Sequence, residues 1–136
     1  MLSTFEKILL LREVPFFRDL TTDELRRVSA ICREVTFSAG DLIMRAGEEG
    51  SELFILENGK VRVYSGLEDV DLSPPAHFGE MAILGSGKRN ATIEVIEDVN
   101  ALSISNDHFR KLILDNPSII FPIVRSLLER LTAKSE

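Results

Sequence analysis

Two charged side chains near a glycine-rich stretch have the types and spacing to bind an anion beside a hydroxyl group. Glu80 follows Gly79, and Arg89 comes nine residues after Glu80. Glycine lets a backbone turn sharply and approach a ligand closely, and a single helical turn after it would leave its first N–H groups without internal partners. Such N–H groups and a guanidinium both suit phosphate oxygens.

A phosphate would be repelled by the Glu80 carboxylate, so we expect this side chain to accept a hydrogen bond from a hydroxyl instead. The loop Gly85-Ser86-Gly87 between the two charged residues is flexible enough to fold Arg89 back over the turn. An anion site, a hydroxyl acceptor and the apolar residues nearby together describe a nucleotide ligand.

The composition limits how large that ligand can be. The chain has 136 residues, 44% of them hydrophobic and 28% charged, which is the profile of one globular domain. Its net charge of −6 provides no field for a polyanion. We therefore expect a small anion rather than DNA or an acidic membrane surface.

The setting predicted from the sequence is cytoplasmic. Cys32 is the single cysteine, so no intrachain disulfide can form. The N-terminal residues lack the basic start and apolar run of a signal peptide, and no stretch approaches 18 consecutive apolar residues. We accordingly expect no membrane association.

The elements that must position the charged residues begin with helices. Thr21 and Glu24 have the spacing of a capping box, and apolar residues follow at helical intervals, which predicts a helix over about Thr22–Cys32. A further helix is predicted over Phe5–Leu11. On an apolar helix face, Cys32 is interpreted as a packed hydrophobe rather than a reactive thiol.

From Val35 to Ile104 the sequence consists of short β-branched and aromatic runs separated by turn residues, which predicts a compact antiparallel roll. Asn58-Gly59 is the strongest local signal for a turn. Both central residues of a type I′ hairpin need positive φ, so we predict a two-residue hairpin there. Phe37, Phe54 and Phe109 are interpreted as core residues.

Helices are predicted again after the roll. Ser105 can cap a helix that ends near Asn116-Pro117, and a last helix runs to about Ala133, with Pro122 marking either its start or a kink. Its apolar stripe comprises Ile120, Val124, Leu127 and Leu131. This stripe fits either the core or the seam of a homodimer, and the sequence leaves both open.

The segment Phe78-Gly79-Glu80-Met81-Ala82-Ile83-Leu84, together with Arg89 and Ala91-Thr92-Ile93, resembles the phosphate-binding cassette of cyclic-nucleotide-binding domains. Catabolite-activator regulators, protein kinase A regulatory subunits and cyclic-nucleotide-gated channels contain such domains. The resemblance covers about Leu10 to Leu131. It implies a mainly β fold, a double-stranded β-helix or jelly-roll-like β-roll with N-terminal helices and C-terminal helices of the B and C type. We expect a single domain over 1–136, helical over 1–33, a β-roll over 34–104 and helical again over 105–134.

The resemblance also implies roles for individual residues. Arg89 would pair with a cyclic phosphate, Glu80 would accept from the ribose 2′-hydroxyl, and Gly79 would let the ribose lie close. Backbone groups around Met81, Ala82 and Ala91 would donate to phosphate oxygens. The site residues implied in this way are Phe78, Gly79, Glu80, Met81, Ala82, Arg89, Asn90 and Ala91.

The ligand implied is a cyclic mononucleotide, and we expect cAMP rather than cGMP. Asn90 takes a place where the family often has Ala, Thr or Ser and which influences base preference. An amide both donates and accepts, so this residue leaves adenine and guanine open. The last helix would close over the base, with Pro122 as a hinge, and would pass the signal to an effector protein that the sequence does not identify.

Two other classes of function are a non-binding scaffold and an enzyme. Pro74-Pro75 before the cassette and the unusual Asn90 favour a degenerate domain that serves as an interaction scaffold without binding nucleotide. An enzyme is not expected, because no Ser, His and Asp arrangement has supporting context. His77 and His108 lie 31 residues apart without further ligands at metal spacing, so no metal is expected.

Overall fold

The computed structural model describes residues 1–85 and 88–135 of the chain. The predicted loop residues Ser86 and Gly87 lie outside these described residues. The elements, in chain order, are α1 (Thr4–Leu11), η1 (Pro15–Phe17), α2 (Thr22–Ala30), β1 (Arg33–Phe37), β2 (Leu42–Met44), β3 (Glu52–Tyr64), β4 (Val70–Leu72), β5 (His77–Phe78), α3 (Met81–Leu84), β6 (Thr92–Ser105), α4 (Asn106–Asp115), η2 (Pro117–Ile119) and α5 (Ile120–Ser135).

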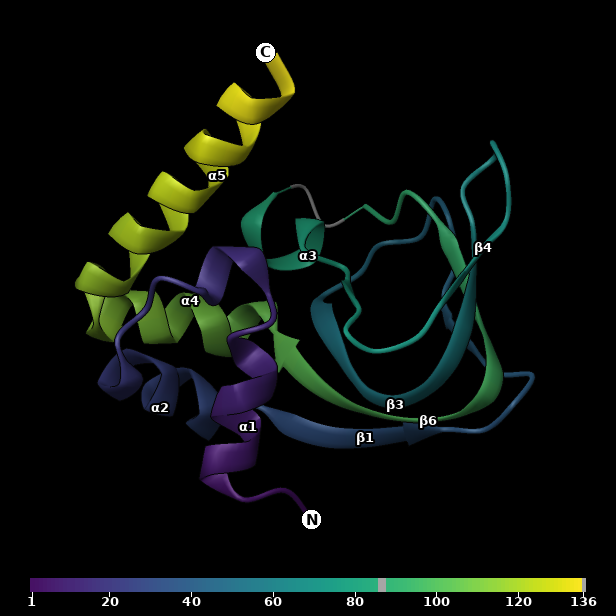
Figure 1. The fold of residues 1–136 in the computed structure, drawn as a ribbon, viewed down its shortest axis with the longest axis horizontal. Coiled ribbons are helices and arrows are strands. Elements are labelled where there is room, and N and C mark those ends of the chain that lie inside the picture. The colour runs from purple at the N-terminus through teal and green to yellow at the C-terminus, as the bar shows by residue number, and fades with distance from the viewer. Residues whose placement is uncertain (86–87, 136) are drawn as a thin grey trace.

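The helices begin where side chains satisfy their first N–H groups. The predicted capping box of Thr21 and Glu24 starts α2, and a second, unpredicted capping box of Ser3 and Glu6 starts α1. The hydroxyl of Ser105 accepts from the amide of His108 at 3.2 Å, as predicted for the start of α4. These caps fix both ends of the roll to helices, and Figure 1 shows the helices gathered beside the curved strands.

The strands form one strongly curved antiparallel sheet. Its order is β1-β6-β3-β4, with β2 also paired to β6 and β5 also paired to β3. The two long strands β3 and β6 pair over most of their length and curl together into the roll (Figure 1). The predicted β-roll with flanking helices is confirmed as the fold.

The hairpin predicted at Asn58-Gly59 is wrong. Strand β3 continues through both residues, and its pairing register with β6 shifts on either side of them. Gly59 has φ +96°, and a Cβ there would lie 2.4 Å from the carbonyl oxygen of Asp98. The glycine therefore serves a bulge that bends the strand against its neighbour instead of reversing the chain. Strand β6 likewise runs without interruption from Thr92 to Ser105, through Asp98.

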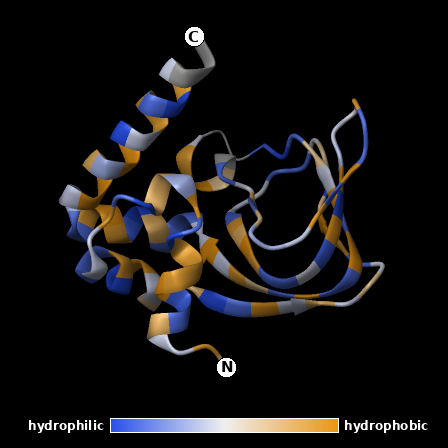
Figure 2. Cartoon of the chain, viewed as in Figure 1, coloured by the Kyte–Doolittle hydropathy of each residue, from blue (hydrophilic) through white to orange (hydrophobic). Residues whose placement is uncertain are grey.

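Alternate side chains of the strands enter two different cores. Leu53 and Ile55 of β3 pack with the helices, whereas Phe54 and Leu56 face the interior of the roll. Figure 2 shows hydrophobic and hydrophilic residues interspersed along the strands. As predicted, Phe54 and Phe109 are buried, while Phe37 is partly buried against the roll interior.

The last helix starts at Ile120, so Pro122 lies in its first turn and does not kink it. A proline is tolerated there because its missing N–H would have no helical partner. The predicted apolar stripe is divided between the core and the surface. Ile123 is buried and Leu127 partly buried against the core, whereas Val124 and Leu131 are exposed.

Cys32 lies at the end of α2 with 8% of its surface exposed, and its thiol donates to the carbonyl of Val28. Burial raises the pKa of this thiol to about 12. The interpretation of Cys32 as a packed hydrophobe agrees with this environment. Among the described helices, none is long and apolar enough to cross a bilayer.

Candidate functional site

The guanidinium of Arg89 is held in a narrow space between two glycines. Its Nη1 donates to the carbonyl oxygen of Glu52 at 3.0 Å. A Cβ on Gly50 would lie 1.9 Å from Nε of Arg89, and a Cβ on Gly79 would lie 2.7 Å from Nη1. Gly79 also has φ +93°, a backbone conformation that residues other than glycine rarely adopt. Both glycines are therefore needed for the guanidinium to lie where it does.

The backbone of Arg89 is fixed by the loop that precedes β3. Its amide donates to the carbonyl of Glu48, and its carbonyl accepts from the amide of Gly47, both at 2.9 Å. One residue further on, Glu49 and Lys88 form an antiparallel bridge. Segments about forty positions apart in the sequence are thus joined directly at the arginine.

The electrostatic environment of Arg89 suits an incoming anion. Its side chain is partly buried, and burial lowers the pKa of its guanidinium while the nearby Glu52 opposes that shift. Among the described residues, no carboxylate lies within 4.0 Å of this guanidinium. A charge that is partly removed from water and lacks an ionic partner gains from a phosphate.

Glu80 lies at the start of the short helix α3, beside this arginine-holding turn. Its Oε1 lies 2.7 Å from Nδ1 of His77, and its carbonyl accepts from the amides of Ile83 and Leu84. The carboxylate is about one-third exposed. A carboxylate that is about one-third exposed thus lies in the turn after Gly79, whose α-carbon borders the partly buried guanidinium of Arg89.

Helix α3 is also tied to the C-terminal helices. The amide nitrogen Nδ2 of Asn106 donates to the carbonyl of Ala82 at 2.6 Å, and its backbone N–H donates to the carbonyl of Ser51 at 2.7 Å. Asn106 is the first residue of α4. It therefore joins α4 to the turn after Gly79 and to the loop that carries Gly50.

The other predicted site residues have different environments. Phe78 and Ala91 are buried, with the Phe78 ring 6.0 Å from that of Phe54. Asn90 is exposed. Ala82 is buried, and its amide already donates to the carbonyl of Gly79 at 2.9 Å, in contrast to the predicted unpartnered donor. The structure brings Gly79, Glu80 and Arg89 together.

Three residues that shape the site were not among those predicted. Gly50 borders the guanidinium, Glu52 supplies the carbonyl that receives it, and His77 contacts Glu80. The only sequence signal for Gly50 was its glycine type, which also fits an ordinary turn. A backbone carbonyl carries no residue-type signal, so Glu52 could not be found from sequence.

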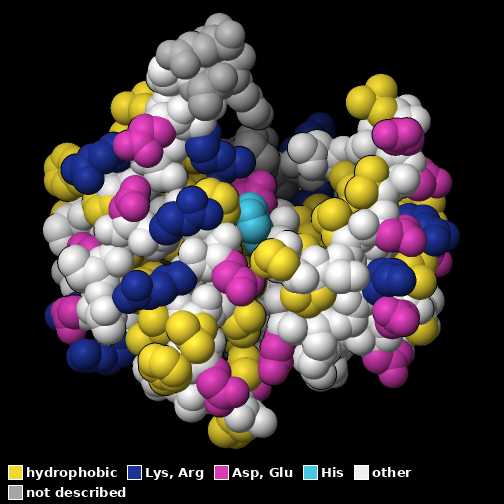
Figure 3. Space-filling model, in the orientation of Figure 1, with side chains coloured by type: hydrophobic (Ala, Val, Ile, Leu, Met, Phe, Trp, Pro, Cys, Tyr) yellow, Lys and Arg dark blue, Asp and Glu magenta, His cyan; other side chains and the backbone are white. Residues whose placement is uncertain are grey.

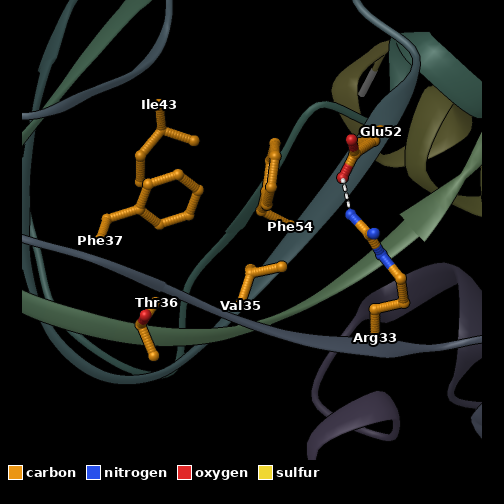
Figure 4. Close-up of a pocket in the computed structure, with 7 residues that line it drawn as sticks. All are labelled: Arg33, Val35, Thr36, Phe37, Ile43, Glu52 and Phe54. Atoms are coloured by element: carbon orange, nitrogen blue, oxygen red, sulfur yellow. Dashed lines mark ion pairs between the residues drawn. The ribbon is translucent and has the colours of Figure 1, made fainter.

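A groove of about 460 Å³ adjoins the site through Glu52 (Figure 4). The rings of Phe37 and Phe54 line one part of it, and the ion pair of Arg33 with Glu52, at 4.0 Å, lies at the other. Glu52 also accepts from the hydroxyl of the buried Ser103. Glu52 thus contacts the Arg89 site with its backbone and the groove with its side chain.

The described residues contain no cluster of three or more His, Cys, Asp or Glu side chains that could hold a metal ion. On the face drawn in Figure 3, acidic and basic side chains are interspersed.

The family model of the cyclic nucleotide-binding domain matches residues 34–116, which include the roll and the entire site. The chain belongs to the cyclic nucleotide-binding domain family. This domain is 36% identical over 112 residues to a cGMP-dependent protein kinase from Drosophila melanogaster, covering 76% of this chain and 12% of the kinase. It is 34% identical over 121 residues to a cyclic nucleotide-gated potassium channel from Mesorhizobium japonicum, covering 89% of this chain and 34% of the channel.

A cAMP-dependent protein kinase regulatory subunit from Hypocrea atroviridis is 30% identical over 104 residues, covering 76% of this chain and 22% of the subunit. The domain thus spans about a third or less of these relatives. Among solved structures, the N-terminal domain of a transcriptional regulator from Streptomyces coelicolor A3(2) has a TM-score of 0.82 at 23% identity, covering 93% of this chain and 92% of that one. At this identity, the similarity shows that the two domains share a fold.

Proposed function

We propose that this domain binds a cyclic mononucleotide, with Arg89 pairing with the cyclic phosphate and Glu80 accepting from the ribose 2′-hydroxyl. The observation that carries the proposal is the Arg89 guanidinium, held between Gly50 and Gly79 without a carboxylate partner among the described residues. A Cβ at either glycine would collide with the guanidinium, so the two glycines form a cradle that holds the arginine in this position.

The backbone contributes to the proposed phosphate site at two places. The amides of Met81 and Ala91 are the donors we assign, because that of Ala82 is already engaged within the α3 turn. Phe78 anchors the segment before Gly79 by packing in the hydrophobic cluster inside the roll. No reaction is proposed, because the ligand acts by being bound.

Calorimetric titration with cAMP tests this assignment. Losing one partner of a charged contact costs about 2–5 kcal/mol, so Arg89→Ala is expected to weaken binding roughly 30-fold to several thousandfold. Arg45→Ala removes the same charge from an exposed side chain in the loop that carries Gly50, and should change the dissociation constant by less than about threefold. Equal affinities of wild type and Arg89→Ala would overturn the phosphate assignment.

Absence of binding to any cyclic nucleotide would favour the interaction scaffold instead. In that case neither cAMP nor cGMP would raise the melting temperature, because only a ligand that binds the native state stabilises it.

The preferred base is proposed to be adenine. Asn90 follows Arg89 and its side chain is exposed, so it is free to meet a ligand from the solvent side. We expect a lower dissociation constant for cAMP than for cGMP, and a change of that ratio in Asn90→Ala. Tighter binding of cGMP to the wild type would reverse the assignment.

The signal is proposed to pass through α5. Ile123 is buried against the core, and the hydroxyl of Ser126 donates to the carbonyl of Pro15 at 3.0 Å. Beyond this anchor the helix extends away from the body of the domain (Figure 1). Hydrogen exchange over residues 120–135 should therefore change on addition of cAMP, and unchanged exchange would refute the coupling.

The exposed face of α5 is proposed as a homodimer seam. Its apolar residues recur at steps of three and four, with 44–66% of each exposed, and they are Phe121, Val124, Leu128 and Leu131. Sedimentation should give a dimer for the wild type and a monomer for Leu128→Glu. A monomeric wild type would exclude the seam.

A further inference from the structure

His77 and Glu80 form a short side-chain contact beside the Arg89 cradle. The distance from Nδ1 of His77 to Oε1 of Glu80 is 2.7 Å, and the two side chains are 21% and 36% exposed. The chain turns between them at Gly79, whose φ of +93° brings the two side chains together. The contact therefore follows from the same turn that makes room for Arg89.

The position of the imidazole is fixed from two sides. His77 pairs with Ile55 in the β5–β3 ladder, which sets its backbone. Its ring meets the edge of Phe16, a fully buried residue, at a centroid distance of 6.3 Å. Among the described residues, Glu80 is the one charged group in contact with this ring.

The chemistry of the pair determines which atom carries the proton. An ionised carboxylate only accepts hydrogen bonds, so Nδ1 of His77 is the donor in the pair with an ionised Glu80. A neutral ring with its proton on Nδ1 and a protonated ring both satisfy this condition. The contact engages Oε1 of Glu80, and within the described chain no other side chain contacts this carboxylate.

We propose that His77 is a positioning residue that sets the recognition of the ribose hydroxyl. By holding Oε1, it fixes the plane of the carboxylate and leaves Oε2 as the atom that accepts from the 2′-hydroxyl. The loss of Glu80 rotamer freedom is then complete before the ligand arrives, which is the usual benefit of preorganisation. This inference rests on the proposed function.

The test compares cAMP with 2′-deoxy-cAMP in two matched variants. Asn places its Nδ2 donor on Cγ, at the same place in the side chain as Nδ1 of histidine, and Leu places a methyl group there. The wild type should bind cAMP about 10- to 100-fold more tightly than the deoxy analogue, the range for a hydrogen bond to a charged group. In His77→Leu that ratio should fall at least about threefold, whereas His77→Asn should keep it within about twofold.

The outcomes separate this inference from the proposed function. A wild type that binds neither nucleotide refutes both. A wild type that discriminates between them, together with an unchanged ratio in His77→Leu, refutes only the role of His77. Loss of discrimination in both variants also refutes it, because the donor would then be irrelevant.

A spectroscopic measurement on the wild type covers the case in which His77→Leu does not fold. Nitrogen-15 spectra of the imidazole at mildly alkaline pH, where histidine is normally neutral, report which ring nitrogen is protonated. A protonated Nδ1, present before and after addition of cAMP, supports the proposal. An unprotonated Nδ1 in either state overturns it.

Discussion

The α-carbon of Gly50 lies against the guanidinium of Arg89, so that a Cβ at this glycine would fall 1.9 Å from Nε and 2.2 Å from Cζ. Gly50 is thus in direct contact with the arginine side chain and leaves no room for a side chain of its own. The backbone of Gly50 itself does not have a positive φ, so the requirement for glycine there is steric and concerns the arginine alone.

Gly50→Ala is therefore expected to weaken cAMP binding by about tenfold or more, because the added methyl group displaces the guanidinium from its hydrogen bond with Glu52. The melting temperature should change little. Gly47→Ala is the matched control, since its Cβ meets no atom within 4 Å but its φ is +86°. It should lower stability by about 1–2 kcal/mol and leave affinity nearly unchanged, and a reversed pattern would contradict this account of the cradle.

Gly59→Ala should be strongly destabilising. The residue combines φ +96° with a Cβ position 2.4 Å from the carbonyl oxygen of Asp98. We expect a loss of more than about 2 kcal/mol in the free energy of unfolding, measured in urea. Gly66→Ala has a similar φ of +90° in open space and should lose only about 1–2 kcal/mol. Equal losses would show that strand contact at the bulge contributes nothing.

Cys32 should resist alkylation in the folded protein and react readily after unfolding, because burial raises the pKa of its thiol from 9.0 to about 12. The unfolded chain ionises first, so this residue stabilises the fold below about pH 9 and loses that contribution as pH rises towards 12. The free energy of unfolding, measured by urea denaturation at a series of pH values in this range, should fall more steeply with pH for the wild type than for Cys32→Ala. An equal pH dependence in the two proteins would refute the raised pKa of Cys32.

The pKa of Asp71 should lie below 3.8, because its carboxylate accepts hydrogen bonds from Arg62 at 2.7 and 3.1 Å. A lowered pKa in the folded state gives stability that is present above the ordinary value and is lost as pH falls through the folded value. Carboxyl carbon chemical shifts across an acid titration measure it. In Arg62→Gln the titration should move back towards 3.8, and an unmoved midpoint would exclude the arginine as the cause.

How far the sequence predicts this fold depends on the range of the interactions involved. The capping boxes and the Ser105 cap are local, so Thr21 and Ser105 indicated helix starts correctly. The role of Gly59 depends on Asp98 of the neighbouring strand, and its sequence neighbours alone favoured a hairpin. The exposed and buried faces of α5 were likewise set by η1 and the core, which helical spacing alone does not identify.

The same distinction applies to the candidate site. Gly79, Glu80 and Arg89 are separated by short distances in the sequence and have chemically distinctive types, so they were predictable. Glu52 contributes a backbone oxygen from another strand, and His77 contributes through a contact with Glu80 across the positive-φ turn at Gly79. Contacts of that kind cannot be predicted from the types of the residues that make them.

The two hydrogen bonds of Asn106 have a consequence for building chimaeric proteins from this domain. A strand and a helix are usually joined by several loop residues, and insertions there are well tolerated. Here α4 follows β6 without any intervening loop, and its first residue holds both Ala82 and Ser51. An insertion between Ser105 and Asn106 would therefore separate α4 from both segments, so a chimaeric protein built from this domain has to keep this junction unbroken.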